Sequence, residues 1–122
     1  MEDKRELRFF HPSEFACRCG CGRAEMNGEF LERLDQARDL AGAPFHVTSG
    51  FRCPAHNLAV GGVAGSAHAK GLAVDIACPD SRTRALVLGG LIRAGFGRLG
   101  IAKNFIHADL DPDKPSPAVW TY

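Results

Sequence analysis

Residues 66–75 read SAHAKGLAVD, and this stretch, together with FIHAD at 105–109, decides how the chain folds and what it can bind. The two stretches carry His68, Asp75 and His107 in the order imidazole, carboxylate, imidazole. A catalytic zinc ion takes three protein ligands of these types and keeps a fourth position open for water. The metal lowers the pKa of that water to roughly 7, which yields a hydroxide nucleophile at neutral pH. The pattern therefore predicts a hydrolytic zinc centre held by these three side chains.

The alternation of side chains predicts two strands that carry the ligands. In residues 72–78, Asp75 shares one face with two alanines, which leave space beside its carboxylate. Residues 105–110 alternate in the same way, with His107 on one face. If the two strands are neighbours, Asp75 and His107 come within coordination range, and a glycine turn returns His68 to them from the preceding loop.

The rest of the chain predicts a small α+β domain spanning residues 1–122, with a central antiparallel sheet flanked by helices. Its first 27 residues form a loop-rich arm, and Asn27 is a favoured helix N-cap. The further expected elements are helices over 27–41, 54–60 and 81–94, and strands over 45–49 and 98–102. Residues 111–119 contain three prolines, so we expect extended coil there until Trp120 and Tyr122 anchor the tail.

Composition excludes several classes of function. The net charge of +1, from 15 basic and 14 acidic residues, argues against a nucleic-acid-binding surface. The charged N-terminus has no apolar region of a secretory signal behind it, and the chain has no stretch of about 20 apolar residues for a membrane span. We therefore expect a monomer that is made in the cytoplasm without a signal peptide and is not inserted in a membrane.

Five cysteines are an odd number, so at least one stays outside any intramolecular disulfide. Cys17, Cys19 and Cys21 alternate with other residues, whereas Cys53 and Cys78 lie far along the chain. Zinc fingers use paired Cys-x-x-Cys spacings, which are absent here. Free thiols are the preferred interpretation; a structural zinc site and a pairing of Cys17 with Cys53 after release are the alternatives.

The motif Ser-x-His-x-x-Gly-x-Ala-x-Asp followed by a late histidine resembles the zinc D-Ala-D-Ala carboxypeptidases and related peptidoglycan peptidases of the M15 family. Two further segments are similar to members of that family, TSGFRCP at 48–54 and FACRCGCG at 15–22. The resemblance covers residues 9–122. It implies the small α+β fold that this family shares with hedgehog signalling domains.

Carried onto this chain, the resemblance makes His68, Asp75 and His107 the zinc ligands. Arg52 matches the arginine that holds a substrate carboxylate or carbonyl, and a guanidinium suits bidentate carboxylate binding. Ser66 matches a serine that orients the substrate or the metal-binding loop; a simple turn-forming role is the alternative.

The general base departs from the family pattern. Several relatives carry an acidic residue three positions before the last metal ligand, where this chain has Asn104. Asp109, two residues after His107, is the available substitute and is expected to act as the catalytic base. A partner that orients a metal-bound histidine is the other role open to Asp109.

The resemblance implies a zinc-dependent peptidase that hydrolyses the stem peptide of bacterial peptidoglycan, as a D-Ala-D-Ala carboxypeptidase or an endopeptidase of the endolysin type. Such a protein is expected to act on the cell wall after release by a separate membrane-permeabilising protein. The alternative is a non-catalytic module in which zinc is structural and the domain binds a wall fragment or a protein. The sequence leaves open which peptide bond is cleaved.

Overall fold

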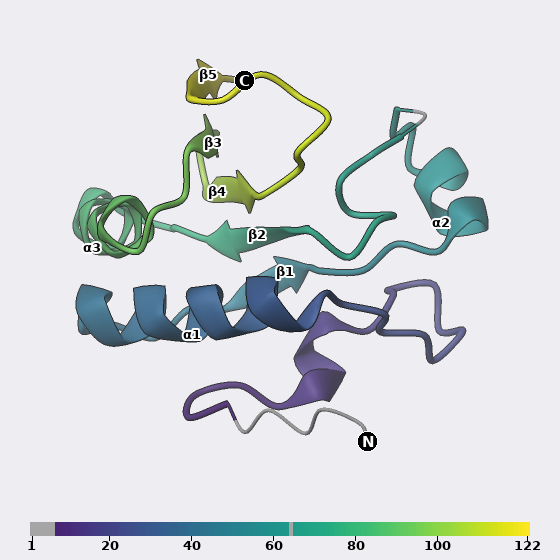
Figure 1. Ribbon diagram of the computed structural model, residues 1–122, viewed down its shortest axis with the longest axis horizontal. Helices are drawn as coiled ribbons and strands as arrows, with labels where there is room; N and C mark the ends of the chain where they lie inside the picture. The colour runs from purple at the N-terminus through teal and green to yellow at the C-terminus, as the bar shows by residue number, and fades with distance from the viewer. Residues whose placement is uncertain (1–6, 64) are drawn as a thin grey trace.

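The computed structural model describes residues 7–63 and 65–122 and shows an α+β fold (Figure 1). The first six residues of the predicted arm therefore lie outside the described residues. The elements are η1 (Pro12–Phe15), α1 (Gly28–Ala41), β1 (Val47–Ser49), α2 (Pro54–Ala59), β2 (Ala73–Ala77), α3 (Ser81–Arg93), β3 (Arg98–Ile101), β4 (Phe105–Asp109) and β5 (Ala118–Thr121). Every helix and strand expected from the sequence is present, with ends moved by at most two residues.

The five strands form one sheet in the order β1-β2-β4-β3-β5. Within this order, β1, β2, β4 and β3 pair with one another in antiparallel fashion, as predicted. The expectation of coil until Trp120 is wrong, because residues 118–121 form β5, which runs parallel to β3 and makes the sheet mixed. The prolines all precede this strand, and the N–H of Ala118 donates to Gly97 O over 2.8 Å. Pairing thus begins directly after the last proline, at a sheet edge where proline is tolerated.

One face of the sheet packs against the helices. Its apolar side chains join those of α1 and α3 in a single core, which includes Phe30, Leu34, Val74, Ile76, Val87, Leu91 and Ile106. Close packing of α3 on α1 accounts for one of the two glycines of α3, Gly90. A Cβ at Gly90 would lie 2.4 Å from Ala37 O, so the missing side chain lets α3 approach α1 closely. The opposite face of the sheet carries Asp75, His107 and Asp109.

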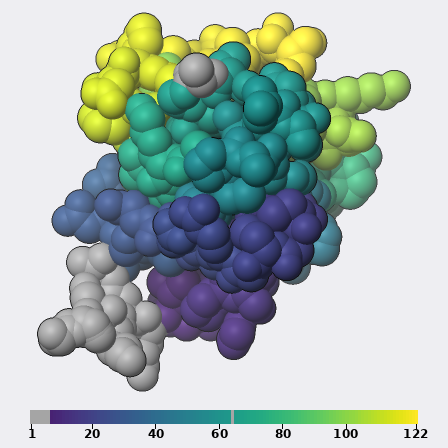
Figure 2. Space-filling view, turned by 90° about the vertical axis from the view of Figure 1, so that its right-hand side faces the viewer, coloured from purple at the N-terminus to yellow at the C-terminus, as the bar shows by residue number. Residues whose placement is uncertain are grey.

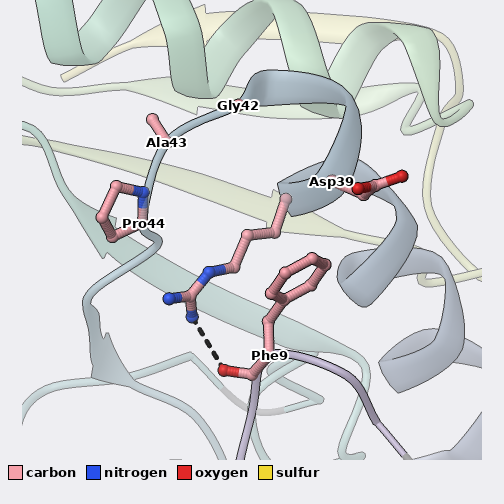
Figure 3. Close-up of a pocket in the computed structure, with 6 residues that line it drawn as sticks. Phe9, Asp39, Gly42, Ala43 and Pro44 are labelled. Carbon is pink, nitrogen blue, oxygen red and sulfur yellow. Dashed lines mark hydrogen bonds between the residues drawn. The ribbon is translucent and has the colours of Figure 1, made fainter.

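The arm is held against α1 by polar contacts at its start. The backbone N–H groups of Arg8 and Phe9 each donate to the carboxylate of Asp35 over 3.0 Å. Arg38 Nη1 donates to Phe9 O over 3.0 Å beside a hollow of about 310 Å³ at the end of α1 (Figure 3). These contacts hold residues 8 and 9 against α1, before the chain turns toward the loop after β1. None of the helices in the described part of the chain is long and apolar enough to cross a membrane.

Candidate metal centre

Asp75 and His107 face each other across two neighbouring strands. They are directly paired in the β2–β4 register, and Asp75 Oδ1 lies 3.0 Å from His107 Nδ1. Strand alternation places both side chains on the face that the helices leave free. The condition on which the sequence-based prediction of the site depended, that these strands are neighbours, is therefore met.

His68 reaches the same point from the turn that precedes β2. Its Nε2 lies 3.4 Å from Asp75 Oδ1, and its backbone N–H donates to Ser66 Oγ over 3.2 Å. The turn closes at Gly71, whose φ of +72° is a conformation that L side chains rarely adopt. A Cβ at Gly71 would also lie 2.1 Å from Glu25 O, so the arm packs directly on this turn.

Each histidine has its second ring nitrogen held by an acceptor. His68 Nδ1 lies 2.8 Å from Gly50 O, and His107 Nε2 lies 2.7 Å from Asp109 Oδ2. A carbonyl and a carboxylate accept protons, so both of these nitrogens carry the N–H. The lone pairs therefore belong to His68 Nε2 and His107 Nδ1, the two nitrogens that face Asp75. This arrangement is typical of metal-ligating histidines.

The three side chains fit a zinc ion in size and in chemistry. Zinc bonds to imidazole and carboxylate are about 2.0–2.1 Å long, which gives about 3.3 Å between two ligand atoms of a tetrahedron. The two separations from Asp75 Oδ1 are 3.0 and 3.4 Å, and one ligand atom from each residue lies within 4.8 Å of the others. Two nitrogen donors beside one carboxylate suit zinc better than the oxygen-seeking calcium and magnesium ions.

Charge at this cluster is arranged for a cation. Burial opposes ionisation of Asp75, but the adjacent rings of His107 and His68 outweigh it and hold the pKa of that carboxyl well below its usual range. Burial also opposes a charged His107, yet hydrogen bonds to Asp109 and Asp75 raise the pKa of its ring. The facing atoms of His107 and Asp75 thus favour a positive charge between them, which a bound metal ion would supply.

Asp109 is placed behind His107, away from the ligand atoms. Its Oδ2 binds His107 Nε2, while its Oδ1 accepts from Arg98 Nε over 2.7 Å and from the N–H of Asp111 over 3.1 Å. The residue is 1% exposed. Burial raises the pKa of Asp109, but the hydrogen bonds from His107, Asp111 and Arg98 outweigh it and lower the pKa overall. Both oxygens are thus engaged, Oδ2 by the ring of His107 and Oδ1 by Arg98 and the Asp111 N–H.

Arg52 and Ser66 lie at the edge of the cluster. Arg52 Nη2 is 3.8 Å from Asp75 Oδ2, and the Arg52 side chain keeps 19% of its surface exposed. Its backbone N–H donates to His68 O over 3.2 Å. Ser66 is buried, and its hydroxyl accepts the N–H of His68. Asn104, by contrast, is an exposed residue in the turn between β3 and β4.

Sequence reasoning missed the wall that β5 builds beside the ligands. The ring centroids of Trp120 and His107 lie 5.6 Å apart. Arg98 also contacts Trp120, with its Cζ 4.8 Å from the ring centroid. A Cβ at Gly100 would come within 2.5 Å of Trp120 Nε1, so this glycine makes room for the indole. The alternation of Trp120 and Tyr122 with polar or small residues was the available signal, and the preceding prolines obscured it.

A second missed element is the ion pair that braces the His68 turn. Lys70 Nζ donates to both oxygens of Asp111 over 3.0 Å, and the Asp111 side chain is fully buried. Lys114 Nζ lies 3.3 Å from the same carboxylate. Because Lys70 follows His68 by two residues and Asp111 follows Asp109 by two, the pair links the two ligand-bearing segments.

Comparison with protein families gives one match. The family model described as Peptidase M15 matches residues 8–109, which include all three ligand candidates and Asp109. No curated protein matches the chain.

Proposed function

The chain belongs to the peptidase M15 family, and from that premise we propose that it is a zinc-dependent peptidase that cleaves the stem peptide of bacterial peptidoglycan. The observation that carries this proposal is the pair of histidine lone pairs, on His68 Nε2 and His107 Nδ1, that face the ionised carboxylate of Asp75. When bound there, zinc supplies an activated water and a Lewis acid for the scissile carbonyl.

The chain's own residues prepare this chemistry before any substrate arrives. Gly50 O and Asp109 hold the protons of the two imidazoles on the far nitrogens, so the near nitrogens stay available as ligands. The pKa of Asp75 is lowered despite its burial, which favours the ionised carboxylate. The three donors are therefore fixed in place and in protonation state, and little reorganisation is needed during the reaction.

Arg52 supports a substrate with a free carboxylate or a polarised carbonyl. Its guanidinium sits beside Asp75 with part of its surface open to solvent. A guanidinium binds carboxylates in a bidentate manner, and the C-terminus of a stem peptide offers such a group. We assign Arg52 to substrate binding and Ser66 to orienting the turn that carries His68.

Asp109 receives a positioning role in this proposal, in place of the general-base role that the sequence favoured. Both of its oxygens are engaged by His107, Arg98 and the Asp111 N–H, so it acts on the metal through the orientation of His107. A base must reach the attacking water within about 3 Å or through one further water. The geometry of Asp109 does not support that reach.

The substrate assignment places the site of action at the cell wall. We propose that the protein works there after release from the cytoplasm, with the peptidoglycan stem peptide as its partner. Asn104, at the position where relatives carry an acidic residue, favours a second candidate: a non-catalytic module that binds wall fragments through the same site.

Digestion of purified peptidoglycan and of synthetic stem peptides by the zinc-loaded protein separates the two candidates. Mass spectrometry of the products is the readout. We expect a product that disappears with a chelator and with His68→Ala, but persists with His56→Ala, a histidine of α2 outside the cluster. The product mass would identify the bond. A bound zinc ion with no product on any substrate, together with retained binding to wall fragments, would replace the peptidase by the binding module.

A further inference from the structure

A second cluster of metal-ligating side chains lies where the arm meets the segment after β1. Cys17, Cys19 and Cys21 come from the arm, and Cys53 comes from the residue before α2. One sulfur from each of the four lies within 4.8 Å of the others. We propose that these four cysteines bind a structural zinc ion, separate from the centre at His68, that fastens the arm to the segment carrying Arg52.

The sulfur positions match a tetrahedral site. Zinc–thiolate bonds of about 2.3 Å put the sulfurs of a four-cysteine site about 3.8 Å apart. Cys17 Sγ lies 3.4 Å from Cys19 Sγ and 3.7 Å from Cys53 Sγ, and the latter two are 3.6 Å apart. Three nearly equal separations describe one face of such a tetrahedron. A disulfide would instead draw one pair of sulfurs to about 2.05 Å, well inside these separations.

The backbone around Cys17, Cys19 and Cys21 folds into a tight loop that brings their sulfurs together. Gly20 and Gly22 adopt φ values of +89° and +82°, which turn the chain after Cys19 and Cys21. Two hydrogen bonds close this loop, from Cys17 N–H to Arg23 O over 2.7 Å and from Gly20 N–H to Cys17 O over 3.3 Å. This folding explains how alternate cysteines converge without the Cys-x-x-Cys spacing of zinc fingers.

Charge and packing around the sulfurs also suit a thiolate site. The N–H of Cys53 donates to Cys17 Sγ over 3.3 Å, a contact that stabilises negative charge on sulfur. Phe51 packs against Cys17 and Cys53 and is itself covered by Arg23, whose Cζ lies 5.2 Å from the ring. Zinc with four thiolates carries net negative charge, and the guanidinium of Arg23, which also pairs with Glu25, attracts that charge at Cys21 and Cys53.

Cys53 of the cluster directly follows Arg52, which lies at the edge of the first metal centre. In Figures 1 and 2 the arm segment after η1 lies beside the segment that leads into α2. That segment contributes Gly50 O, which holds His68, and Arg52, which contacts Asp75. Phe51 N–H also donates to Phe15 O of the arm over 2.9 Å. A metal at Cys53 would therefore hold these groups against the sheet.

Metal content of single variants tests this proposal without recourse to activity. In protein purified under reducing conditions without chelator, we expect two zinc ions per chain in the wild type and one in His68→Ala. Cys19→Ser and Cys21→Ser should each retain one, and His68→Ala combined with Cys19→Ser should retain none. Cys19 and Cys21 are exposed, so their replacement leaves the apolar core intact. The control is Cys78→Ala, a buried cysteine outside the cluster, which should keep both ions.

Spectroscopy keeps the proposal testable if a cysteine variant fails to fold. Cobalt-substituted His68→Ala protein should show intense thiolate-to-cobalt charge-transfer absorption. X-ray absorption of its zinc form should show sulfur at about 2.3 Å. Absence of both signals, retention of two ions by Cys19→Ser, or a Cys17–Cys53 disulfide in place of metal would overturn the proposal. Because these measurements do not involve peptide cleavage, failure of the proposed peptidase activity leaves them unaffected.

Discussion

Asp75 Oδ1 and His107 Nδ1 lie 3.0 Å apart at directly paired positions of β2 and β4. The other nitrogen of His107 donates its proton to Asp109, so two acceptors would face each other here unless a cation lay between them. The raised pKa of His107 and the lowered pKa of Asp75 agree with this geometry, because both shifts favour a positive charge between the two groups.

Asp75→Asn removes the negative charge of the side chain while it keeps the side-chain shape. We expect zinc affinity to fall by more than about 100-fold, as measured by competition with a chromogenic chelator. This loss exceeds the loss of affinity of about 10–100-fold that is typical when a residue hydrogen-bonded to a metal ligand is replaced.

Asp109→Ala tests whether this carboxylate positions His107 or acts as a base. Loss of the partner that orients a ligating histidine should lower zinc affinity about 10–100-fold. Excess zinc should then restore turnover, because the three ligands remain. The two roles separate at saturating zinc: unchanged affinity with turnover abolished would assign Asp109 as the base.

Arg52→Lys keeps the positive charge but loses the planar fork of donors. We expect the KM for stem peptides with a free C-terminal carboxylate to rise about 10–100-fold, since charge-assisted hydrogen bonds contribute about 1.5–3 kcal/mol. The same variant should change the KM for C-terminally amidated peptides much less. Equal losses on both peptide types would argue against carboxylate binding by Arg52.

Gly71→Ala should disturb the turn that carries His68. Its φ of +72° and the approach of Glu25 O both oppose a side chain, so we expect the free energy of unfolding to fall by about 1–3 kcal/mol. Gly89→Ala is the matched control, because a Cβ there meets no atom within 4 Å in α3. That variant should be about 0.5–1 kcal/mol more stable than the wild type. Urea denaturation of both variants measures the difference, and equal stability would contradict the account of the turn.

Asp111→Asn should remove a pH-dependent part of the stability. Burial raises the pKa of Asp111, but hydrogen bonds from the Asp113 N–H, Lys70 and Lys114 outweigh it and lower the pKa overall. A carboxyl with a lowered pKa stabilises the fold above its unfolded value of about 3.9, and this contribution is lost as the pH falls through the folded value. We expect a loss of about 1–3 kcal/mol at pH 7.

The free-energy difference between wild type and Asp111→Asn should therefore shrink as the pH is lowered from neutral toward about 3. Unfolding by urea at several pH values provides the measurement. A difference that stays constant, or grows in acid, would show that the Lys70–Asp111 pair does not supply it.

The features that the sequence predicted correctly are those that depend on local patterns of residues. Alternation in β2 and β4 gave Asp75 and His107 each a place on one face of its strand, and these faces meet because the two strands pair. The Asn27 side chain accepts the N–H of Phe30, as its identity as an N-cap predicted. These features depend on neighbours within one turn or one strand, which a sequence displays directly.

The unpredicted part depends on contacts between distant segments. β5 pairs with β3 only once the chain has passed three prolines, so alternation around Trp120 did not indicate that this residue lies beside His107. The proton positions on His68 and His107 are set by Gly50 and Asp109 and follow only from the folded geometry. The sequence left free thiols, a structural zinc site and a pairing of Cys17 with Cys53 open, and only the fold brings Cys53 to the arm cysteines across more than thirty intervening residues.

Diffraction from crystals of the protein on either side of the zinc absorption edge tests the central claim most directly. The account predicts an anomalous peak enclosed by His68 Nε2, Asp75 Oδ1 and His107 Nδ1, with metal–ligand distances of about 2.0–2.1 Å and an open side toward Arg52. A zinc-replete protein with no peak at these three atoms, or with the position filled by a fourth protein ligand, would contradict it.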